Sequence, residues 1–324
     1  MGKGQLQIYG NANPWYDAGM KLILDIDTGI DDALAIAYTL ANSQIELLGC
    51  TCTFGNVQAT QSARNTLAIL HLLGRDDIPV YVGDSHPWGQ KSYRIEPSSE
   101  KFHGKNGLGD IEIEDSPRKP EKKSADEFLV ESVEKYGTEL SIVTTGPVAD
   151  LASFVLNHPT LRSKMGPLTM MGGSLLYGGN ATPYAEANFL HDVKAAKFLL
   201  SSSIRKTMVG LDVTETVNLT KEDADKWETM GKKGKTFASL LRFYLSRHAD
   251  QTRCFVHDPT SVICALHKEW FTFLPVPLTV IQEGEMKGMT IGSREVENPT
   301  DVAVSADRQT VEEDLRSAYE RIFR

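Results

Sequence analysis

Four aspartates lie within eight residues near the start of the chain. Asp25, Asp27, Asp31 and Asp32 belong to the stretch LILDIDTGIDDALAIAYTL (22–40), which is typical of a buried strand followed by an amphipathic helix. Helix-dipole and capping effects favour acidic residues at a helix N-terminus, and they account for two of the four. Four carboxylates held close together raise one another's pKa unless a positive group lies between them. A hard divalent cation with oxygen ligands fits that need, and Ca²⁺ accepts several carboxylates more readily than Mg²⁺.

The segments around this cluster alternate between strand-like and helix-like patterns. Strand-like apolar runs cover residues 21–26, 45–54, 78–83, 140–146, 168–173 and 206–213, and helical spacing covers 31–41, 58–74, 147–156 and 192–202. This alternation predicts an α/β fold with a doubly wound, mostly parallel central sheet and helices on both faces. Ligands of such sheets bind beyond the carboxyl ends of the strands, where Asp25 and Asp27 lie.

The last third of the chain has a different pattern. Helical spacing at 221–248 and 259–266 and strand-like runs at 277–282 and 288–292 predict extra helices beside the sheet and a short antiparallel extension. Capping boxes formed by Ser124 with Glu127 and by Thr310 with Glu313 predict two helix starts. We expect one domain over residues 20–324. Residues 1–19, without periodicity, are set apart as a leader, either added to the natural chain or native to it.

Composition and charge favour a small-molecule partner. The net charge of the 324 residues is −9 and their Lys and Arg are scattered, so we expect no nucleic-acid and no membrane partner. We find no apolar stretch of about 18 residues and no signal sequence, which predicts a cytoplasmic protein. The four cysteines, which lack paired C-x-x-C spacing, are expected to be buried reduced thiols: Cys50, Cys52, Cys254 and Cys264.

A competing interpretation and three further motifs bear on function. DIDTG (25–29) is similar to the nucleophile strand of haloacid-dehalogenase-type phosphatases, although that pattern has Thr or Val where this chain has Gly29. The further motifs are TTGPVADLA (144–152), MGGSLLYGGNATPYAEANFLHD (171–192) and FVHDPTSV (255–262).

In this order, the motifs resemble those of the inosine-uridine-preferring nucleoside hydrolases, which share DxDxGxDDA, TGP, MGG, NxxPxAExN and a late HDP. The resemblance runs from Lys21 to the C-terminus. It implies hydrolysis of the N-glycosidic bond of ribonucleosides such as inosine and uridine, giving ribose and free base. It also implies a homo-oligomer, a dimer or a tetramer.

Carried over by position, the resemblance implies roles for individual residues. A Ca²⁺ ion would be held by the Asp27, Asp32 and Asp258 carboxylates and the main-chain carbonyl of Thr145, with Asp27 as general base for the metal-bound water. Asp25 would support the site from behind. His257 would act on the leaving base, and His103 would lie on a mobile loop, residues 83–110, that covers it. The remaining substrate-binding residues would be Asp31, Asn56, Met171, Asn180, Glu186 and Asn188.

Two alternatives remain open at this point. The first is the phosphatase suggested by DIDTG, for which we find no convincing later motifs. The second is a ribonucleoside-binding or Ca²⁺-binding protein without catalysis; the presence of Asp27 and Asp258 argues against it. The resemblance also implies that Tyr244 and His248, which lie one helical turn apart, could face the base as residues of the family's late helix do.

Overall fold

The computed structural model describes residues 19–324, and an eight-stranded sheet forms their centre. The leader set apart in the sequence lies, up to residue 18, outside the described residues. The strand order is β3-β2-β1-β4-β5-β6-β12-β9, with all pairs parallel except the edge pair β12–β9. The bounds are β1 Met20–Ile26, β2 Ile45–Cys52, β3 Val80–Val82, β4 Leu140–Thr144, β5 Leu168–Met171, β6 Lys206–Val209, β9 Phe271–Val276 and β12 Thr300–Ala306.

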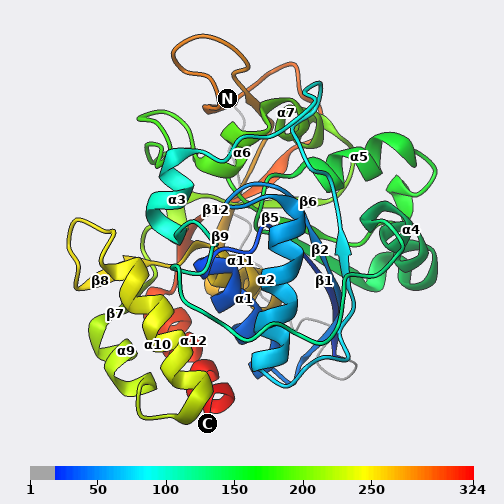
Figure 1. The fold of residues 1–324 in the computed structure, drawn as a ribbon. Helices are drawn as coiled ribbons and strands as arrows, with labels where there is room; N and C mark the ends of the chain where they lie inside the picture. The colour runs from blue at the N-terminus through cyan, green and yellow to red at the C-terminus, as the bar shows by residue number, and fades with distance from the viewer. Residues whose placement is uncertain (1–18) are drawn as a thin grey trace.

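Helices cover both faces of this sheet, as the alternating pattern predicts. In Figure 1, α4 and α5 lie on the right of the sheet, and α9, α10 and α12 lie together at the lower left. The bounds are α1 Ile30–Ala41, α2 Ala59–Leu72, α3 Pro97–His103, α4 Ala125–Tyr136, α5 Ala149–Asn157, α6 Ala187–His191, α7 Val193–Ser201, α8 Leu211–Thr214, α9 Lys221–Trp227, α10 Gly231–Leu245, α11 His257–Leu266 and α12 Arg308–Phe323.

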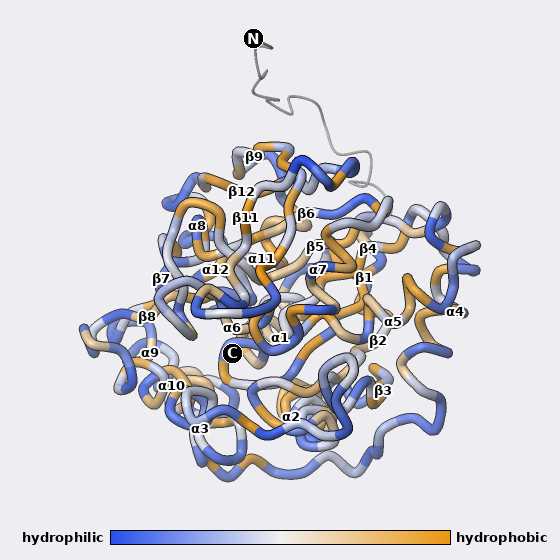
Figure 2. The backbone as a smooth tube through the Cα atoms, turned by 90° about the horizontal axis from the view of Figure 1, so that it is seen from above, coloured by the Kyte–Doolittle hydropathy of each residue, from blue (hydrophilic) through white to orange (hydrophobic). Residues whose placement is uncertain are grey.

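The core consists of two apolar clusters on opposite sides of the sheet. Strand β1 shows the division, because Leu22, Leu24 and Ile26 belong to one cluster and Ile23 belongs to the other. This alternation is the period of two expected of a strand buried on both faces. Figure 2 shows hydrophobic residues along the central strands and hydrophilic residues along the outer loops. The four cysteines are buried and free, as predicted.

The C-terminal third contains the predicted helices and antiparallel extension, and also strands that the pattern missed. β10 (Leu278–Val280) and β11 (Thr290–Gly292) form the extension, and β7 (Asn218–Thr220) pairs with β8 (Arg253–Phe255). The central sheet additionally gains β12 and β9. β9 contains Pro275, which is tolerated because β9 lies at an edge of the sheet.

Two local predictions are corrected and one is confirmed. The Ser124–Glu127 capping box opens α4, but α12 is capped by Asp307, which accepts a hydrogen bond from the main-chain N–H of Thr310. The strand predicted over 206–213 ends at Val209, because the chain turns at Gly210, where a Cβ would lie 2.6 Å from the carbonyl oxygen of Gly173. Among residues 19–324 we find no helix with the length and apolar character needed to cross a bilayer.

Candidate functional site

A cavity of about 390 Å³ opens at the carboxyl ends of the central strands, beside the aspartate cluster. Its lining includes ten of the residues predicted from the sequence: Asp31, Asn56, His103, Thr145, Met171, Asn180, Glu186, Asn188, His257 and Asp258. The two other predicted metal ligands lie directly beneath it, since Asp27 accepts hydrogen bonds from Asn56 and Asp32 accepts one from Thr145. The fold therefore brings every predicted site residue to one edge of the sheet.

Asp27 is buried in the turn that joins β1 to α1. Its Oδ2 accepts a hydrogen bond of 2.7 Å from the main-chain N–H of Asn56, and its Oδ1 lies 3.3 Å from the side-chain amide of the same residue. The preceding residue, Gly55, has φ +155°, and a Cβ there would lie 1.9 Å from Asp27 Oδ2. Only glycine allows the backbone after β2 to approach the carboxylate this closely.

Asp32 and Asp31 occupy the first turn of α1 and have different surroundings. Asp32 caps the helix, because its Oδ2 accepts from Gly29 N at 2.8 Å, and its Oδ1 accepts from the Thr145 hydroxyl at 2.7 Å. Asp31 Oδ2 accepts from the main-chain N–H groups of His257 at 2.7 Å and Asp258 at 3.2 Å. Asp31 Oδ1 is buried without a hydrogen-bond partner among the described residues. One oxygen beside the cavity thus remains to accept a hydrogen bond.

Asp25 supports the site from below, as the resemblance implies. Its two oxygens accept hydrogen bonds from Thr51 on β2 at 2.6 Å and from Thr144 on β4 at 2.9 Å. These strands flank β1 in the sheet. Asp25 therefore ties the ends of three strands together and does not line the cavity.

The loop after β5 supplies the opposite wall. Glu186 caps α6 by accepting from the N–H groups of Asn188 and Phe189, and it also accepts from Gly173 N at 2.8 Å. Asn188 donates to the Thr145 carbonyl at 2.7 Å, and Asn180 Oδ1 accepts from Ala187 N at 3.0 Å. The amide group of Asn180 keeps its N–H donors for a ligand.

Two histidines reach the cavity from different elements. His103 Nδ1 accepts a hydrogen bond of 3.1 Å from the main-chain N–H of Ile30, so the proton of its neutral ring lies on Nε2. His257 Nδ1 lies 2.7 Å from the Thr214 hydroxyl. Burial lowers the pKa of His103 to about 3 and that of His257 to about 4. Both rings are neutral near pH 7.

Electrostatics at this edge favour a bound cation. Burial raises the pKa of Asp27, Asp32 and Asp258, and the negative charge of Asp32 raises it further for the other two. Within residues 19–324, none of these carboxylates forms an ion pair with Lys or Arg. Unpaired buried charge is costly, so a cation among these oxygens would relieve the repulsion.

The donor set implied by the resemblance is chemically suited to Ca²⁺. It combines three carboxylates with the carbonyl oxygen of Thr145, which accepts from Asn188 and keeps a second lone pair. In the described part of the chain, no three or more His, Cys, Asp or Glu side chains are already arranged as a metal site.

Sequence reasoning missed part of the site. An aromatic group, Phe102, Tyr244 and His248, closes the end of the cavity away from the carboxylates, with ring centroids 4.8–6.4 Å apart. Only Tyr244 and His248 were foreseen, from the resemblance to the family's late helix. Thr214, which orients His257, and Glu215, which lines the cavity, come directly after the segment 206–213 that the sequence suggested was strand. No local signal marked either residue.

Comparisons with known proteins agree with this geometry. Residues 22–313 match the family described as inosine-uridine preferring nucleoside hydrolase. The chain is 34% identical over 275 residues to uridine nucleosidase 1 of Arabidopsis thaliana, covering 84% of this chain and 81% of that protein. It is 33% identical over 278 residues to the pyrimidine-specific ribonucleoside hydrolase RihA of Escherichia coli, covering 84% and 88%.

Solved structures give the same result. The purine-preferring ribonucleoside hydrolase from Gardnerella vaginalis superposes with a TM-score of 0.90 and 39% identity, covering 94% of this chain and 99% of that one. A match over most of the length, at this identity, shows common descent as well as a common fold. The chain belongs to the inosine-uridine preferring nucleoside hydrolase family, and it is a hydrolase that acts on the N-glycosyl bond of ribonucleosides.

Proposed function

We propose that this enzyme is a Ca²⁺-dependent ribonucleoside hydrolase in which Asp27 is the general base. The observation that carries the proposal is the group of buried carboxylates of Asp27, Asp32 and Asp258, which has no Lys or Arg partner within residues 19–324 and lies beside a cavity of nucleoside size. When bound there, Ca²⁺ would compensate this charge and lower the pKa of a coordinated water.

Asp27 is suited to the role of base because both of its oxygens are oriented. The hydrogen bonds from Asn56 fix the plane of the carboxylate without consuming all of its lone pairs. It can therefore accept the proton of a water that attacks the anomeric carbon of the ribose. Desolvation raises the pKa of Asp27, which makes it a stronger base than an exposed carboxylate once it is ionised.

The ribose would be held by polar groups on two sides of the cavity. Asp31 offers its Oδ1, which has no partner among residues 19–324, to a sugar hydroxyl, and Asn56, whose amide lies 3.5 Å from Asp32 Oδ2, lines the same cavity. On the opposite wall, Asn180 donates with its free N–H groups, and Glu186 and Asn188 complete the surface with Met171. Fixed partners of this kind lower the entropic cost of orienting the sugar for reaction.

The two histidines would act on the base. His257 is neutral, and if the Thr214 hydroxyl donates to Nδ1, the proton lies on Nε2, and this N–H can donate a hydrogen bond to the departing base. His103 presents an Nε2–H beside Tyr244, with ring centroids 5.5 Å apart. A hydrogen bond to the base stabilises negative charge that develops as the glycosidic bond breaks.

We propose a broad range of bases, purine and pyrimidine. Aromatic stacking is tolerant of base identity, since every base has a π-face, and the far end of the cavity is aromatic. The names of the relatives point the same way, because they span uridine, pyrimidine and purine nucleosides. The homo-oligomeric state and the cytoplasmic location stay predictions.

One assay tests the proposal. Purified protein should release ribose from inosine and uridine, lose activity with a chelator, and regain it with Ca²⁺. It should also cleave nitrophenyl riboside and leave nitrophenyl phosphate intact, which separates it from a phosphatase. Asp27→Asn should lower kcat by about 10²–10⁴-fold. Wild-type hydrolysis by folded Asp27→Asn protein with bound Ca²⁺ would remove Asp27 as the base.

A further inference from the structure

One face of helix α2 is polar and buried against the turn at residues 27–29, which we call the catalytic turn. Ser62, Asn65 and Thr66 lie on that face, as their spacing of three and four residues requires. Ser62 donates to the Ile26 carbonyl at 3.2 Å, and the Thr66 hydroxyl lies 2.6 Å from that of Thr28. Each of these three side chains therefore has a partner in the strand end or the turn that carries Asp27.

Asn65 is the member of this face that reaches a second segment. Its Nδ2 donates to the Thr28 carbonyl at 2.9 Å and to the Asn106 carbonyl at 2.8 Å, while its Oδ1 accepts from Gln61 at 2.8 Å. The side chain is 4% exposed. Rotation of the amide would bring its oxygen against two carbonyl oxygens, so the geometry allows only one orientation. Asn65 thus bridges the catalytic turn and the loop that follows α3.

The loop at residues 104–110, which we call the clamp loop, behaves as a single unit. Asp110 Oδ1 accepts from Lys105 N at 2.7 Å, and Asn106 Oδ1 accepts from Leu108 N at 2.8 Å and Asp110 N at 3.0 Å. At Gly107, with φ +83°, a Cβ would lie 2.8 Å from Asn65 Nδ2. Side chains within the clamp loop hold it together by hydrogen bonds. The buried side chain of Asn65 connects the clamp loop to the catalytic turn.

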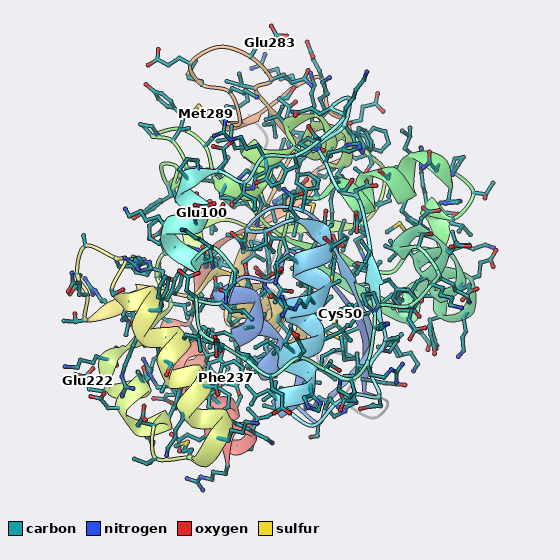
Figure 3. All side chains as sticks on the ribbon, in the orientation of Figure 1. Cys50, Glu100, Glu222, Phe237, Glu283 and Met289 are labelled. Carbon is teal, nitrogen blue, oxygen red and sulfur yellow. The ribbon has the colours of Figure 1, made fainter. Side chains whose placement is uncertain are left out.

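His103 precedes the clamp loop directly and depends on it. Its carbonyl accepts from Gly109 N at 2.7 Å, and its ring accepts from Ile30 N at the start of α1. The helix that carries it, α3, on which Figure 3 labels Glu100, packs against α10, on which the figure labels Phe237. The clamp loop therefore fixes the backbone that carries the His103 ring, and the hydrogen bond from Ile30 N fixes the ring itself.

We propose that Asn65, which does not line the cavity, is a positioning residue that holds the clamp loop on the catalytic turn and thereby holds His103 at the base. This inference rests on the proposed function, since it assigns His103 to the base. The expected consequence is selective, because loss of the bridge displaces His103 and leaves the hydrogen bonds that hold the Asp27 and Asp32 carboxylates in place.

The test is a double-mutant cycle with two substrates. Asn65→Ala should lower kcat/KM for inosine about tenfold, since small misplacement of a group at the reacting centre is costly. It should change kcat/KM for nitrophenyl riboside much less, because that leaving group departs without help. In a His103→Ala background, Asn65→Ala should cause almost no further loss for inosine, as coupled residues are non-additive. Gln61→Ala, which spares both Nδ2 bonds, is the matched control.

A second measurement does not depend on activity. Hydrogen exchange at the amides of the clamp loop should accelerate in Asn65→Ala and stay unchanged in β1. If Asn65→Ala fails to fold, Asn65→Asp tests the same contact, because it keeps the size of the side chain and removes the Nδ2 donor to both carbonyls.

The outcomes separate the inference from the proposed function. If Asn65→Ala lowers kcat/KM equally for both substrates, or lowers it as much in the His103→Ala background as in the wild type, then Asn65 only stabilises the fold of the turn and the inference is wrong. Inosine hydrolysis unaffected by His103→Ala would overturn the inference while the hydrolase function stands. Wild-type protein that leaves inosine and uridine intact would overturn the proposed function itself.

Discussion

Removing divalent cations is expected to make the stability of the protein fall as the pH rises from about 5 to about 7. Burial raises the pKa of Asp31 to about 7 and that of Glu186 to about 7, from ordinary values of 3.8 and 4.5. Without a cation, the folded protein holds protons on these carboxyls that the unfolded chain has already lost. Stability is then greatest below the unfolded pKa values and is lost as the pH rises through the folded ones.

The size of the effect follows from the number of excess protons. Each one contributes about 1.4 kcal/mol per pH unit to the free energy of unfolding. Asp31 and Glu186 together therefore set a slope of up to about 3 kcal/mol per pH unit between their unfolded and folded pKa values. A bound cation keeps nearby carboxylates ionised in the folded state, which removes their excess protons and flattens the slope.

Urea denaturation at pH 5, 6, 7 and 8, with a chelator or with Ca²⁺, measures this slope. We expect the transition midpoint to fall with pH in chelator and to stay nearly level in Ca²⁺. Glu134→Gln, which changes an exposed carboxylate outside the site, should leave both series unchanged. Identical pH dependence with and without Ca²⁺ would refute the reasoning that a cation compensates these buried carboxylates.

Three further predictions address the chemistry and the loop over it. His257→Ala should strongly slow the hydrolysis of inosine and uridine and leave that of nitrophenyl riboside nearly unchanged. Thr214→Val, which removes the hydroxyl at His257 Nδ1, should give the same pattern with a loss of about fivefold to tenfold. Steady-state rates check both variants. Gly55→Ala should abolish turnover of both substrates, because the new Cβ would lie against Asp27 Oδ2, whereas Gly74→Ala, with nothing within 4 Å of its Cβ, should not. Residues 83–110 should gain protection from hydrogen exchange when a ribose analogue binds; unchanged exchange would count against a covering loop.

Local patterns were enough to predict that the aspartate cluster lies at the carboxyl edge of the sheet, whereas the roles proposed for Asn56 and the other sugar contacts came from the resemblance to the family. Asp27, Asp31 and Asp32 follow a strand and open a helix, and Asn56 follows the next strand, so parallel pairing alone brings them to one edge. The alternation of strands and helices likewise predicted the doubly wound sheet. These features depend on short-range periodicity and on a general rule of α/β topology.

The remaining features depend on contacts between distant segments. β12 follows β9 in the chain and pairs with it in the antiparallel direction. The sequence of neither strand indicates which residues of the other it will pair with. The aromatic end of the cavity requires α3 to meet α10, across more than a hundred residues of chain. Thr214 and Asn65 have side chains that are common in loops and helices, and their roles become visible only when their hydrogen-bond partners are known.

This division between the two ends of the cavity has a consequence for base preference. The sugar end is built on the sheet, whereas the base end is built on α3 and α10, which lie outside it. Tyr244 is the central ring of that end, with centroids 5.5 Å from His103 and 4.8 Å from His248. A substitution at Tyr244 should therefore alter contacts with the base and leave the carboxylates in place.

We expect Tyr244→Leu to keep the core filled but to remove the aromatic face. Loss of one aromatic contact is worth about 0.5–1.5 kcal/mol, or roughly twofold to tenfold in kcat/KM. Inosine, with its larger ring system, should lose more than uridine, and nitrophenyl riboside should serve as a measure of the intact sugar end. The ratio of kcat/KM for inosine to that for uridine is the quantity to compare between Tyr244→Leu and wild type. An unchanged ratio, with both rates lowered equally, would show that Tyr244 supports the fold of the cavity rather than the choice of base.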